Sequence, residues 1–220
     1  MRALRPDELS RVALLGAHCD DVAIGVGGTL LALCRSRPGL RVDALVLSGG
    51  GTLREAEEHA ALQAFCPGAS LKVTVLDLPD GRFPAHWERA KQAVESFRTE
   101  LCHPAVEPDI VFAPHVRDAH QDHRMLAELV PTAFRDHLVL RYEIVKWDGD
   151  LGAPTVYQPL PDRVAEAKVD ALLRHYPSQR DRDWFDAETF LGLARVRGVE
   201  CRARYAEAFH VDKMTIGLEA

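Results

Sequence analysis

The chain has 220 residues, of which 47% are hydrophobic, and its formal net charge at pH 7 is −6. This length and composition predict a globular protein, and the acidic balance excludes a generic binder of nucleic acid or anionic membranes, since both require a basic surface. The segment Met1–Glu8 lacks the apolar core of a signal peptide, and no run approaches the ~20 apolar residues of a membrane span. We therefore expect a cytoplasmic protein without a membrane span.

The five cysteines are odd in number and have no CxxC spacing, which argues against a disulfide framework and against a cysteine zinc site. We expect most of them to be small buried hydrophobic residues. Cys19 is the exception because it lies within a candidate site, where we expect its thiol to be reactive or sensitive to oxidation.

Apolar, β-branched runs alternate with helical patterns along the first two thirds of the chain. This alternation is typical of βαβ units, and nearly continuous apolar strands fit a parallel sheet that is buried on both faces. The sequence thus predicts an α/β fold, a Rossmann-like three-layer sandwich with a mostly parallel sheet. We expect strands over 12–17, 42–47, 71–78, 110–113 and 138–145, and helices over 28–35, 53–65, 87–101 and 123–134.

The composition changes after residue 147. Residues 148–154 are rich in turn formers, and we expect them to cross the surface beside a substrate cleft. Helices are predicted over 163–175 and 184–196, and they are expected to close the fold or to form a contact in a homo-oligomer. Because there is no internal repeat or flexible linker, we expect a single domain over 1–220, with a βαβ core over 1–147 and a C-terminal part over 148–220.

Two clusters of histidine and aspartate carry the chemistry. The first, residues 18–21, directly follows the first apolar run, at the strand end where α/β sheets hold their functional residues. There His18 and Asp21 can share a small ion while Asp20 remains free to move a proton. Such a string is often only a solvated turn with an Asp N-cap, but a second cluster, His120–His123, follows another strand-like run. Together the clusters indicate a metallohydrolase.

Nucleotide binding is a second alternative, because the stretch Gly25–Gly28 partly matches a dinucleotide-binding loop. That signature requires its glycines in the turn directly after the strand, and here residues 18–21 occupy that turn. The glycines therefore favour nucleotide binding only weakly.

The two clusters resemble the motifs of the PIG-L/LmbE-like family of zinc-dependent N-deacetylases, which are AHPDD followed by a glycine pair, and HxDH. The match extends to Arg54 and Glu57, which resemble the RxxE helix of the family, and to Asp118–His123, which resembles its DxHxDH form. The resemblance covers essentially the whole chain, and the two metal motifs are its most specific part.

The resemblance implies one Zn²⁺ per chain, or another divalent ion, bound by His18, Asp21 and His123, with positions left for water and the substrate carbonyl. It also implies that Asp20 is the general base and that a protonated His120 stabilises the oxyanion. The leaving amine would gain its proton from Asp20 or His120.

The chain departs from the family pattern at two positions. Cys19 stands where the family has proline, which removes a restraint on φ but leaves the ligand spacings unchanged. Asp118 stands where some members have a tyrosine that polarises the carbonyl, so that role is either absent or supplied by another residue. We place Asp118 and Tyr142 on the substrate side of the site, although a core or edge-strand tyrosine is an equal alternative for Tyr142.

Four further residues have expected roles around these ligands. Asp122 is expected to orient a neighbouring imidazole and to fix its tautomer. Arg54 is expected at the rim of the pocket, where it can donate two hydrogen bonds to a sugar hydroxyl pair or a phosphate; a solvated arginine or an ion-pair partner is the alternative. Trp147 and Trp184 can stack on a sugar face, with core packing as the alternative.

We interpret the sequence as that of a zinc-dependent hydrolase that removes the acetyl group from an N-acetylated amino sugar or its conjugate, a small-molecule substrate. Two alternatives remain open. One is an amidase of the same family that acts on a larger acyl group, and the other is a catalytically silent protein that binds a sugar or a nucleotide. The complete set of ligands and base speaks against the silent protein.

Overall fold

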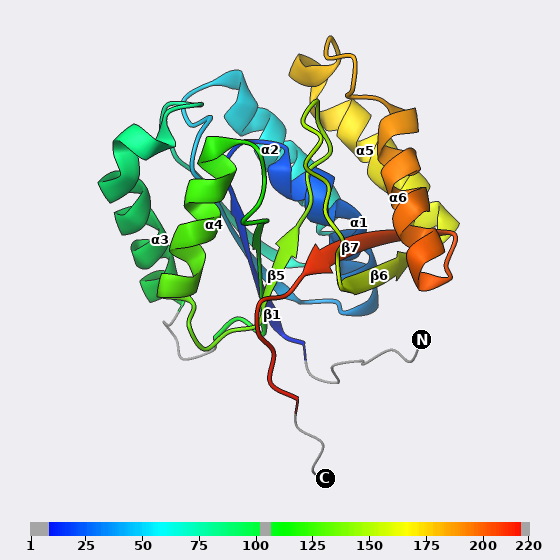
Figure 1. Ribbon diagram of the computed structural model, residues 1–220, viewed down its shortest axis with the longest axis horizontal. Coiled ribbons are helices and arrows are strands. Elements are labelled where there is room, and N and C mark those ends of the chain that lie inside the picture. Colours follow the sequence, from blue (N-terminus) through cyan, green and yellow to red (C-terminus); the bar gives the residue numbers. More distant parts are fainter. Residues whose placement is uncertain (1–8, 102–106, 217–220) are drawn as a thin grey trace.

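The computed structural model describes residues 9–101 and 107–216. Within them, one seven-stranded sheet forms the centre of the molecule (Figure 1). Its strands are β1 (Arg11–Gly16), β2 (Arg41–Val46), β3 (Ser70–Val75), β4 (Ile110–Pro114), β5 (Val139–Tyr142), β6 (Val156–Leu160) and β7 (Tyr205–His210), in the order β3-β2-β1-β4-β5-β7-β6. Strands β1 to β5 are mutually parallel, whereas β7 is antiparallel to β5 and to β6. The predicted α/β fold with a mostly parallel sheet is confirmed.

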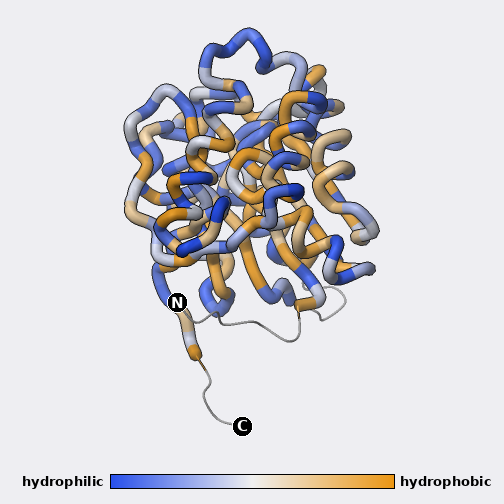
Figure 2. Tube along the Cα trace, turned by 90° about the vertical axis from the view of Figure 1, so that its right-hand side faces the viewer, coloured by the Kyte–Doolittle hydropathy of each residue, from blue (hydrophilic) through white to orange (hydrophobic). Residues whose placement is uncertain are grey.

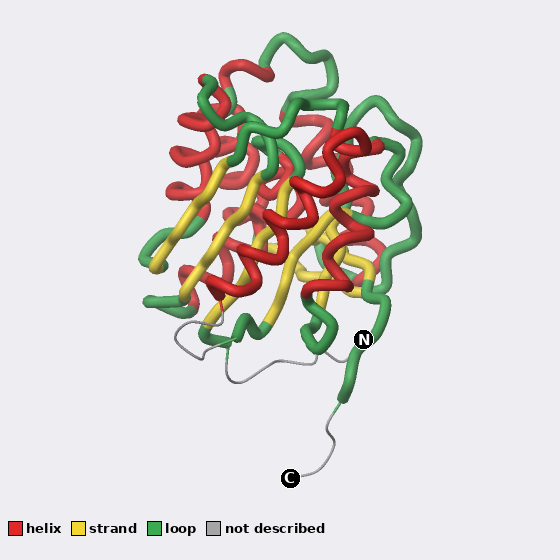
Figure 3. The backbone as a smooth tube through the Cα atoms, turned by 90° about the vertical axis from the view of Figure 1, so that its left-hand side faces the viewer, coloured by secondary structure: helices red, strands yellow, loops and turns green. Residues whose placement is uncertain are grey.

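Helices cover both faces of the sheet (Figures 1 and 3). Side chains alternate along β1, so that Val12 and Leu14 pack in one core and Ala13 and Leu15 in another. The first core includes α1, α2, α5 and α6, and the second includes α3 and α4, which gives three layers. The helices are α1 (Asp21–Ser36), α2 (Leu53–Phe65), α3 (Trp87–Leu101), α4 (Gln121–Ala133), α5 (Asp162–His175) and α6 (Ala187–Cys201), with short 3₁₀ turns η1 (Phe83–His86) and η2 (Pro177–Gln179).

The order of the strands reverses between β1 and β4. The chain proceeds from β1 to β2 and β3 on one side and then returns to place β4 on the other side of β1. At such a switch point the loops after the two neighbouring strands diverge and leave a crevice at the carboxyl edge of the sheet. Residues 17–20 follow β1 and residues 115–120 follow β4, so both sequence motifs lie at this crevice.

Helix α1 begins earlier than the sequence predicts. It starts at Asp21, the last residue of the first motif, whereas the pattern predicts a start at Gly28. Glycine lowers helix propensity, but here it permits close packing. A Cβ at Gly25 would overlap the ring of Tyr142, and one at Gly27 would lie 2.7 Å from Phe65. Tertiary packing therefore outweighs the local preference of this segment.

Of the other predicted helices, α2 and α3 have the predicted bounds, α4 and α5 differ from them by at most two residues at either end, and α6 begins three residues and ends five residues later than predicted. The sequence pattern does not predict β6 and β7. The strand β7 has a charged residue, Glu207, at a buried position, and β6 is an edge strand that contains Pro159. Neither has the continuous apolar run of a central parallel strand, which is why the pattern does not reveal them.

Hydrophobic segments lie mainly in the middle of the molecule, and the loop at the top of the view is hydrophilic (Figure 2). Among the helices in the described ranges, none combines the length and the apolar composition that crossing a bilayer requires. Buried hydrophobic residues form two core clusters, one on either side of the sheet.

Candidate active site

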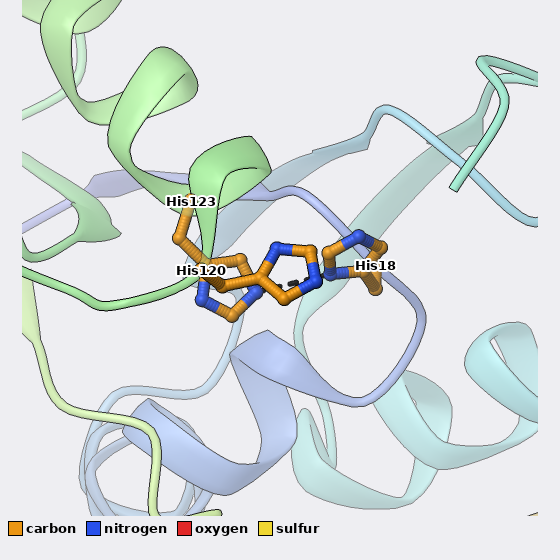
Figure 4. Close-up of side chains that lie close together, drawn as sticks. All are labelled: His18, His120 and His123. Atoms are coloured by element: carbon orange, nitrogen blue, oxygen red, sulfur yellow. Dashed lines mark hydrogen bonds between the residues drawn. The ribbon is translucent and has the colours of Figure 1, made fainter. Parts of the chain in front are cut away.

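Three side chains of the two motifs converge at the crevice. Nδ1 of His18 lies 3.0 Å from Nε2 of His123 (Figure 4), and Oδ2 of Asp21 lies 3.6 and 3.3 Å from these two nitrogens. Ligands of a tetrahedral zinc ion, each about 2.0–2.2 Å from the metal, lie roughly 3.4 Å from one another. The structure thus brings together the three residues that the resemblance assigns to the metal.

The backbone places each of these three residues. His18 follows β1, Asp21 is the first residue of α1, and His123 lies in the first turn of α4. Oδ2 of Asp21 accepts hydrogen bonds from the main-chain N–H groups of Ala17 (3.0 Å) and His18 (2.8 Å). The carboxylate is therefore held against the end of β1, at a helix N-terminus, which also favours negative charge.

Two further carboxylates stand behind the imidazoles. Oδ2 of Asp122 lies 3.2 Å from Nε2 of His18, and Oδ2 of Asp118 lies 2.9 Å from Nδ1 of His123. Each contact engages the ring nitrogen that faces away from the three converging atoms. Such contacts fix the tautomer, so that the other nitrogen is free to bind a cation. Asp122 occupies the position that the sequence analysis expects.

Asp118 contacts protein groups at the position where a substrate contact is expected. It is buried, its Oδ1 lies 3.0 Å from Nζ of Lys146, and the same oxygen accepts a hydrogen bond from the main-chain N–H of His120 at 2.8 Å. With its other oxygen on His123, the carboxylate has protein partners on both sides. The expected substrate contact of Asp118 is therefore replaced by contacts that orient His123.

His120 caps helix α4 and faces the same centre. Its Nδ1 accepts a hydrogen bond from the main-chain N–H of Asp122 at 3.3 Å, which leaves the ring proton on Nε2. Its ring centroid lies 4.8 Å from that of His18 and 4.8 Å from that of His123 (Figure 4). Burial and the charges of the two other histidines lower the pKa of His120. These contacts favour a neutral ring with a free N–H, in place of the protonated ring that the resemblance implies.

Asp20 lies between the start of α1 and the side chain of Arg54. It is 7% exposed, and its Oδ2 accepts a hydrogen bond from Nη2 of Arg54 at 2.7 Å. Burial raises the pKa of Asp20 to about 6, although the Arg54 guanidinium acts in the opposite direction. A carboxyl with a pKa in this range can accept and release a proton near neutral pH, which is what a general base requires.

Both terminal nitrogens of Arg54 have protein partners. Nη2 contacts Oδ2 of Asp20 and also donates to the carbonyl oxygen of Cys19. Nη1 donates to Glu57 at 3.0 Å and to Ser178 at 2.9 Å. From the sequence we expect Arg54 to contact substrate, with an ion-pair partner as the alternative. The observed contacts are those of an ion-pair partner. Arg54 joins α2 to the first motif and to the segment after α5.

Tyr142 is a buried core residue. It is 0% exposed, its ring packs against Gly25, and its hydroxyl donates a hydrogen bond to the carbonyl oxygen of Leu15 at 2.7 Å. The expected substrate contact of Tyr142 is therefore corrected in favour of the core alternative.

Cys19 is buried as well, and its Sγ donates to the carbonyl oxygen of Ser48 at 3.4 Å. Burial and the nearby charge of Glu58 raise the pKa of the Cys19 thiol well above its usual value. Because the thiolate is the reactive form of cysteine, the expected reactivity of this thiol does not fit its surroundings.

Two carboxylates near the site were not predicted from the sequence. Oδ1 of Asp80 lies 3.1 Å from Nε2 of His18, and its side chain is 77% exposed. Asp80 follows β3 and precedes Gly81 in a turn at the same edge of the sheet, which is a signal that was available in the sequence. Glu58 of α2 accepts a hydrogen bond from the main-chain N–H of Asp20 at 2.8 Å, and its place in a helix gives no such signal.

The charges of the site favour a bound cation. Burial lowers the pKa of His123, but Asp21 and Asp118 outweigh burial and raise it to about 9. Burial also raises the pKa of Asp21, but His123 and His18 hold it well below its usual range. A divalent cation can take the place of the imidazole protons here. Two imidazole nitrogens and one carboxylate oxygen form a donor set that catalytic zinc uses, so the residues present fit this metal.

Comparison with known proteins identifies the family. Residues 13–134 match the family model PIG-L, described as GlcNAc-PI de-N-acetylase. The match spans more than half of the chain and includes both metal motifs. The chain therefore belongs to the PIG-L family of de-N-acetylases, which are hydrolases that act on amide bonds, and the resemblance seen in the sequence is confirmed.

Solved structures share the fold at low sequence identity. N,N'-diacetylchitobiose deacetylase from Pyrococcus horikoshii is 23% identical, with a TM-score of 0.68 over 92% of this chain and 83% of that chain. The zinc-inhibited form of teicoplanin deacetylase Orf2 is 16% identical, with a TM-score of 0.67 over 94% of this chain and 100% of that chain. GalB, the 4-carboxy-2-hydroxymuconate hydratase from Pseudomonas putida KT2440, is 15% identical, with a TM-score of 0.70 over 96% of this chain and 100% of that chain. Because one neighbour is a hydratase, the reaction must be argued from the site.

Proposed function

We propose that this protein is a zinc-dependent hydrolase that removes the N-acetyl group from an N-acetylated amino sugar or its conjugate, and releases acetate and a free amine. The observation that carries the proposal is the convergence of Nδ1 of His18, Oδ2 of Asp21 and Nε2 of His123 beside the carboxyl of Asp20. Membership of the family supports amide hydrolysis, and structural neighbours that are deacetylases support an acetyl group.

We assign one zinc ion to His18, Asp21 and His123. Ring nitrogens of His18, His120 and His123 also lie within 4.8 Å of one another, which makes His120 an alternative third ligand. Asp21 is favoured because its Oδ2 lies within 3.6 Å of both other donors and is oriented by two main-chain N–H groups. When bound, zinc supplies a lowered pKa for water and polarisation of the amide carbonyl.

Asp20 is the proposed general base, which takes the proton of the attacking water. Its pKa of about 6 means that the carboxylate form predominates at neutral pH. Because Arg54 contacts Oδ2, we assign the proton transfer to Oδ1. The ion pair also restrains the carboxylate, so that the free oxygen keeps a constant direction.

His120 is the proposed donor to the oxygen of the amide carbonyl. Its Nδ1 accepts the N–H of Asp122, so its Nε2–H is the group available to hydrogen-bond the developing oxyanion. A neutral ring with this single proton would give it up only at the expense of that hydrogen bond. We therefore assign the protonation of the leaving amine to Asp20, which returns the proton that it takes from water.

The test is a screen of zinc-loaded protein against N-acetylglucosamine conjugates, with acetate and free amine measured in the same reaction. We expect the two products in equal amounts and about one zinc per chain by elemental analysis. The matched control is Asp20→Asn, which has nearly the same shape but no base. We expect this variant to retain zinc and to lose about a hundredfold or more in kcat.

Other outcomes would contradict specific parts of the proposal. Cleavage of longer N-acyl analogues without acetate release would assign a larger acyl group. Zinc binding without cleavage of any amide in the screen would favour the binding protein. Normal turnover by zinc-loaded Asp20→Asn would move the base to another residue.

A further inference from the structure

Glu58 is a charged residue in the apolar stripe of helix α2. The buried residues of this helix are Glu58, Ala61, Leu62 and Phe65, which is the spacing of a helix face that packs on a core. Glu58 is 0% exposed. Burial of a carboxyl group is unfavourable unless hydrogen bonds compensate for the lost water, so the partners of Glu58 indicate why a carboxyl stands there.

One oxygen of Glu58 receives two hydrogen bonds. Its Oε2 accepts the main-chain N–H of Asp20 at 2.8 Å and the hydroxyl of Tyr176 at 2.7 Å. Its Oε1 meets no hydrogen-bond partner among the described residues. Tyr176 is itself fully buried and lies at the end of α5. Glu58 thus links the main chain of the proposed base to the end of α5.

The backbone of Asp20 needs such a restraint. Its φ is 105°, which residues with a Cβ rarely adopt and which costs about 1–3 kcal/mol. Its carbonyl oxygen accepts the N–H of Ile24 at 2.8 Å, and its carboxylate accepts Arg54. Without Glu58, the N–H of Asp20 would be buried without an acceptor, and the residue would gain by relaxing to a common φ. Such a relaxation would turn the carboxylate away from its present direction.

We propose that Glu58 is a positioning residue for Asp20, which holds the main chain of the base in its strained conformation, and that Tyr176 holds Glu58 in turn. This inference rests on the proposed role of Asp20 as the base. A displacement of about 1 Å at a catalytic group can lower the rate by about a hundredfold, so the effect belongs in turnover and not in metal binding.

Three variants of the zinc-loaded, full-length protein test the contact. Glu58→Leu removes the acceptor and keeps an apolar side chain in the stripe, and Glu58→Gln keeps an oxygen that can accept the N–H of Asp20. Tyr176→Phe removes only the hydroxyl and is the mildest change, which keeps the test decisive if Glu58→Leu folds poorly. The matched control is Leu62→Ala, in the same stripe of α2 and also 0% exposed, which loosens the helix without touching Asp20.

We expect Glu58→Leu to lower kcat about ten- to a hundredfold with KM and zinc content unchanged, because the base acts only in the transition state. Glu58→Gln should restore kcat to near the parental value, and Tyr176→Phe should give a smaller loss than Glu58→Leu. Leu62→Ala should lower the melting temperature but leave kcat near the parental value.

A second measurement does not depend on activity. The exchange rate of the main-chain amide hydrogen of Asp20, followed by NMR, should rise in Glu58→Leu and stay near the parental rate in Glu58→Gln. If the protein cleaves no amide in the screen, the proposed function fails, and this exchange rate still decides whether Glu58 holds Asp20. Parental kcat or parental exchange at Asp20 in Glu58→Leu would overturn the inference, as would an equal loss of kcat in Leu62→Ala.

Discussion

The loop after β1 and the loop after β4 supply the same residue types to one site but use their carboxylates differently. After β1, Asp21 points to the two converging histidine nitrogens and Asp20 lies beside it, paired with Arg54. After β4, Asp118 and Asp122 each stand behind an imidazole. Residue type and spacing therefore predict which residues gather in the site, whereas the partners of each oxygen determine what a carboxylate does there.

The largest effect should separate Asp21 from His120. We expect Asp21→Ala to lose nearly all zinc and all measurable turnover, because it removes one of three proposed ligands. His120→Ala should retain zinc but lower the activity on the order of a hundredfold or more, because the variant lacks the proposed hydrogen-bond donor to the oxyanion. Elemental analysis after dialysis measures the zinc content of both variants. A zinc-loaded Asp21→Ala together with a zinc-free His120→Ala would replace the ligand set by the three histidines.

The outer carboxylates should give an intermediate effect. Asp118→Asn and Asp122→Asn preserve shape but weaken the hold on each imidazole, and we expect zinc affinity or activity to fall by about ten- to a hundredfold. Competition with a chelator measures the affinity, and acetate release measures the activity. A complete loss of zinc in Asp118→Asn, equal to that in Asp21→Ala, would remove the distinction between the two loops.

The variant Arg54→Ala distinguishes two roles of Arg54, as an ion-pair partner of the base Asp20 or as a direct contact to the sugar. If Arg54 serves Asp20, a small acetamide and an N-acetylglucosamine conjugate should both lose roughly ten- to a hundredfold in kcat/KM, which corresponds to about one charge-assisted hydrogen bond. Kinetics on the two substrates, with zinc content as a control, measure this. A loss confined to the conjugate would restore the role at the pocket rim that the sequence analysis expects.

The smallest effect concerns stability and pH. Burial raises the pKa of Glu58 to about 7 from its ordinary value of about 4.5. The folded protein therefore holds this proton more tightly than the unfolded chain, so the contribution to folding is complete below pH 4.5 and is lost as the pH rises through 7. Relative to Glu58→Gln, the parental free energy of unfolding should fall by up to about 3 kcal/mol over this window.

Urea denaturation of chelator-treated protein measures that difference without the charge of a bound cation. We expect the two proteins to diverge as the pH increases from 4 to 8. Parallel pH profiles of the parental protein and Glu58→Gln would show that Glu58 has the same pKa in the folded protein as in the unfolded chain, which would contradict this prediction.

Elements of the fold could be predicted from the sequence where their hydrophobic residues follow a clear local pattern. The apolar runs of β1 to β5 and the amphipathic patterns of α2 and α3 are local signals, and the structure has these elements close to the predicted positions. The predicted start of α1 was wrong because Gly25 and Gly27 permit close contact with Tyr142 and Phe65, which are distant in sequence. The strands β6 and β7 were missed for another reason: β7 contains the charged Glu207 and β6 is an edge strand with Pro159, so neither has a continuous apolar run.

The site was predictable where both members of a contact lie at strand ends. The spacing of the two motifs places His18 and His123 at neighbouring strands, and their side chains do converge. Asp80 also lies at a strand end and was overlooked. Glu58 has no such sequence signal, because its position in an amphipathic helix predicts only that it faces the core. The burial of Tyr142 also depends on tertiary packing, which no local pattern describes.

The contact between Gly25 and Tyr142 connects the core to the candidate metal site. Tyr142 packs against Gly25 of α1, and its hydroxyl is bonded to Leu15 of β1. Helix α1 carries Asp21 and strand β1 leads into His18, so the Tyr142 ring contacts both elements that carry these two proposed ligands. Cations of different radius require different donor separations. We therefore expect a substitution at Gly25 or Tyr142, both of which are buried, to change the cation preference of the proposed site if it shifts α1 against β1.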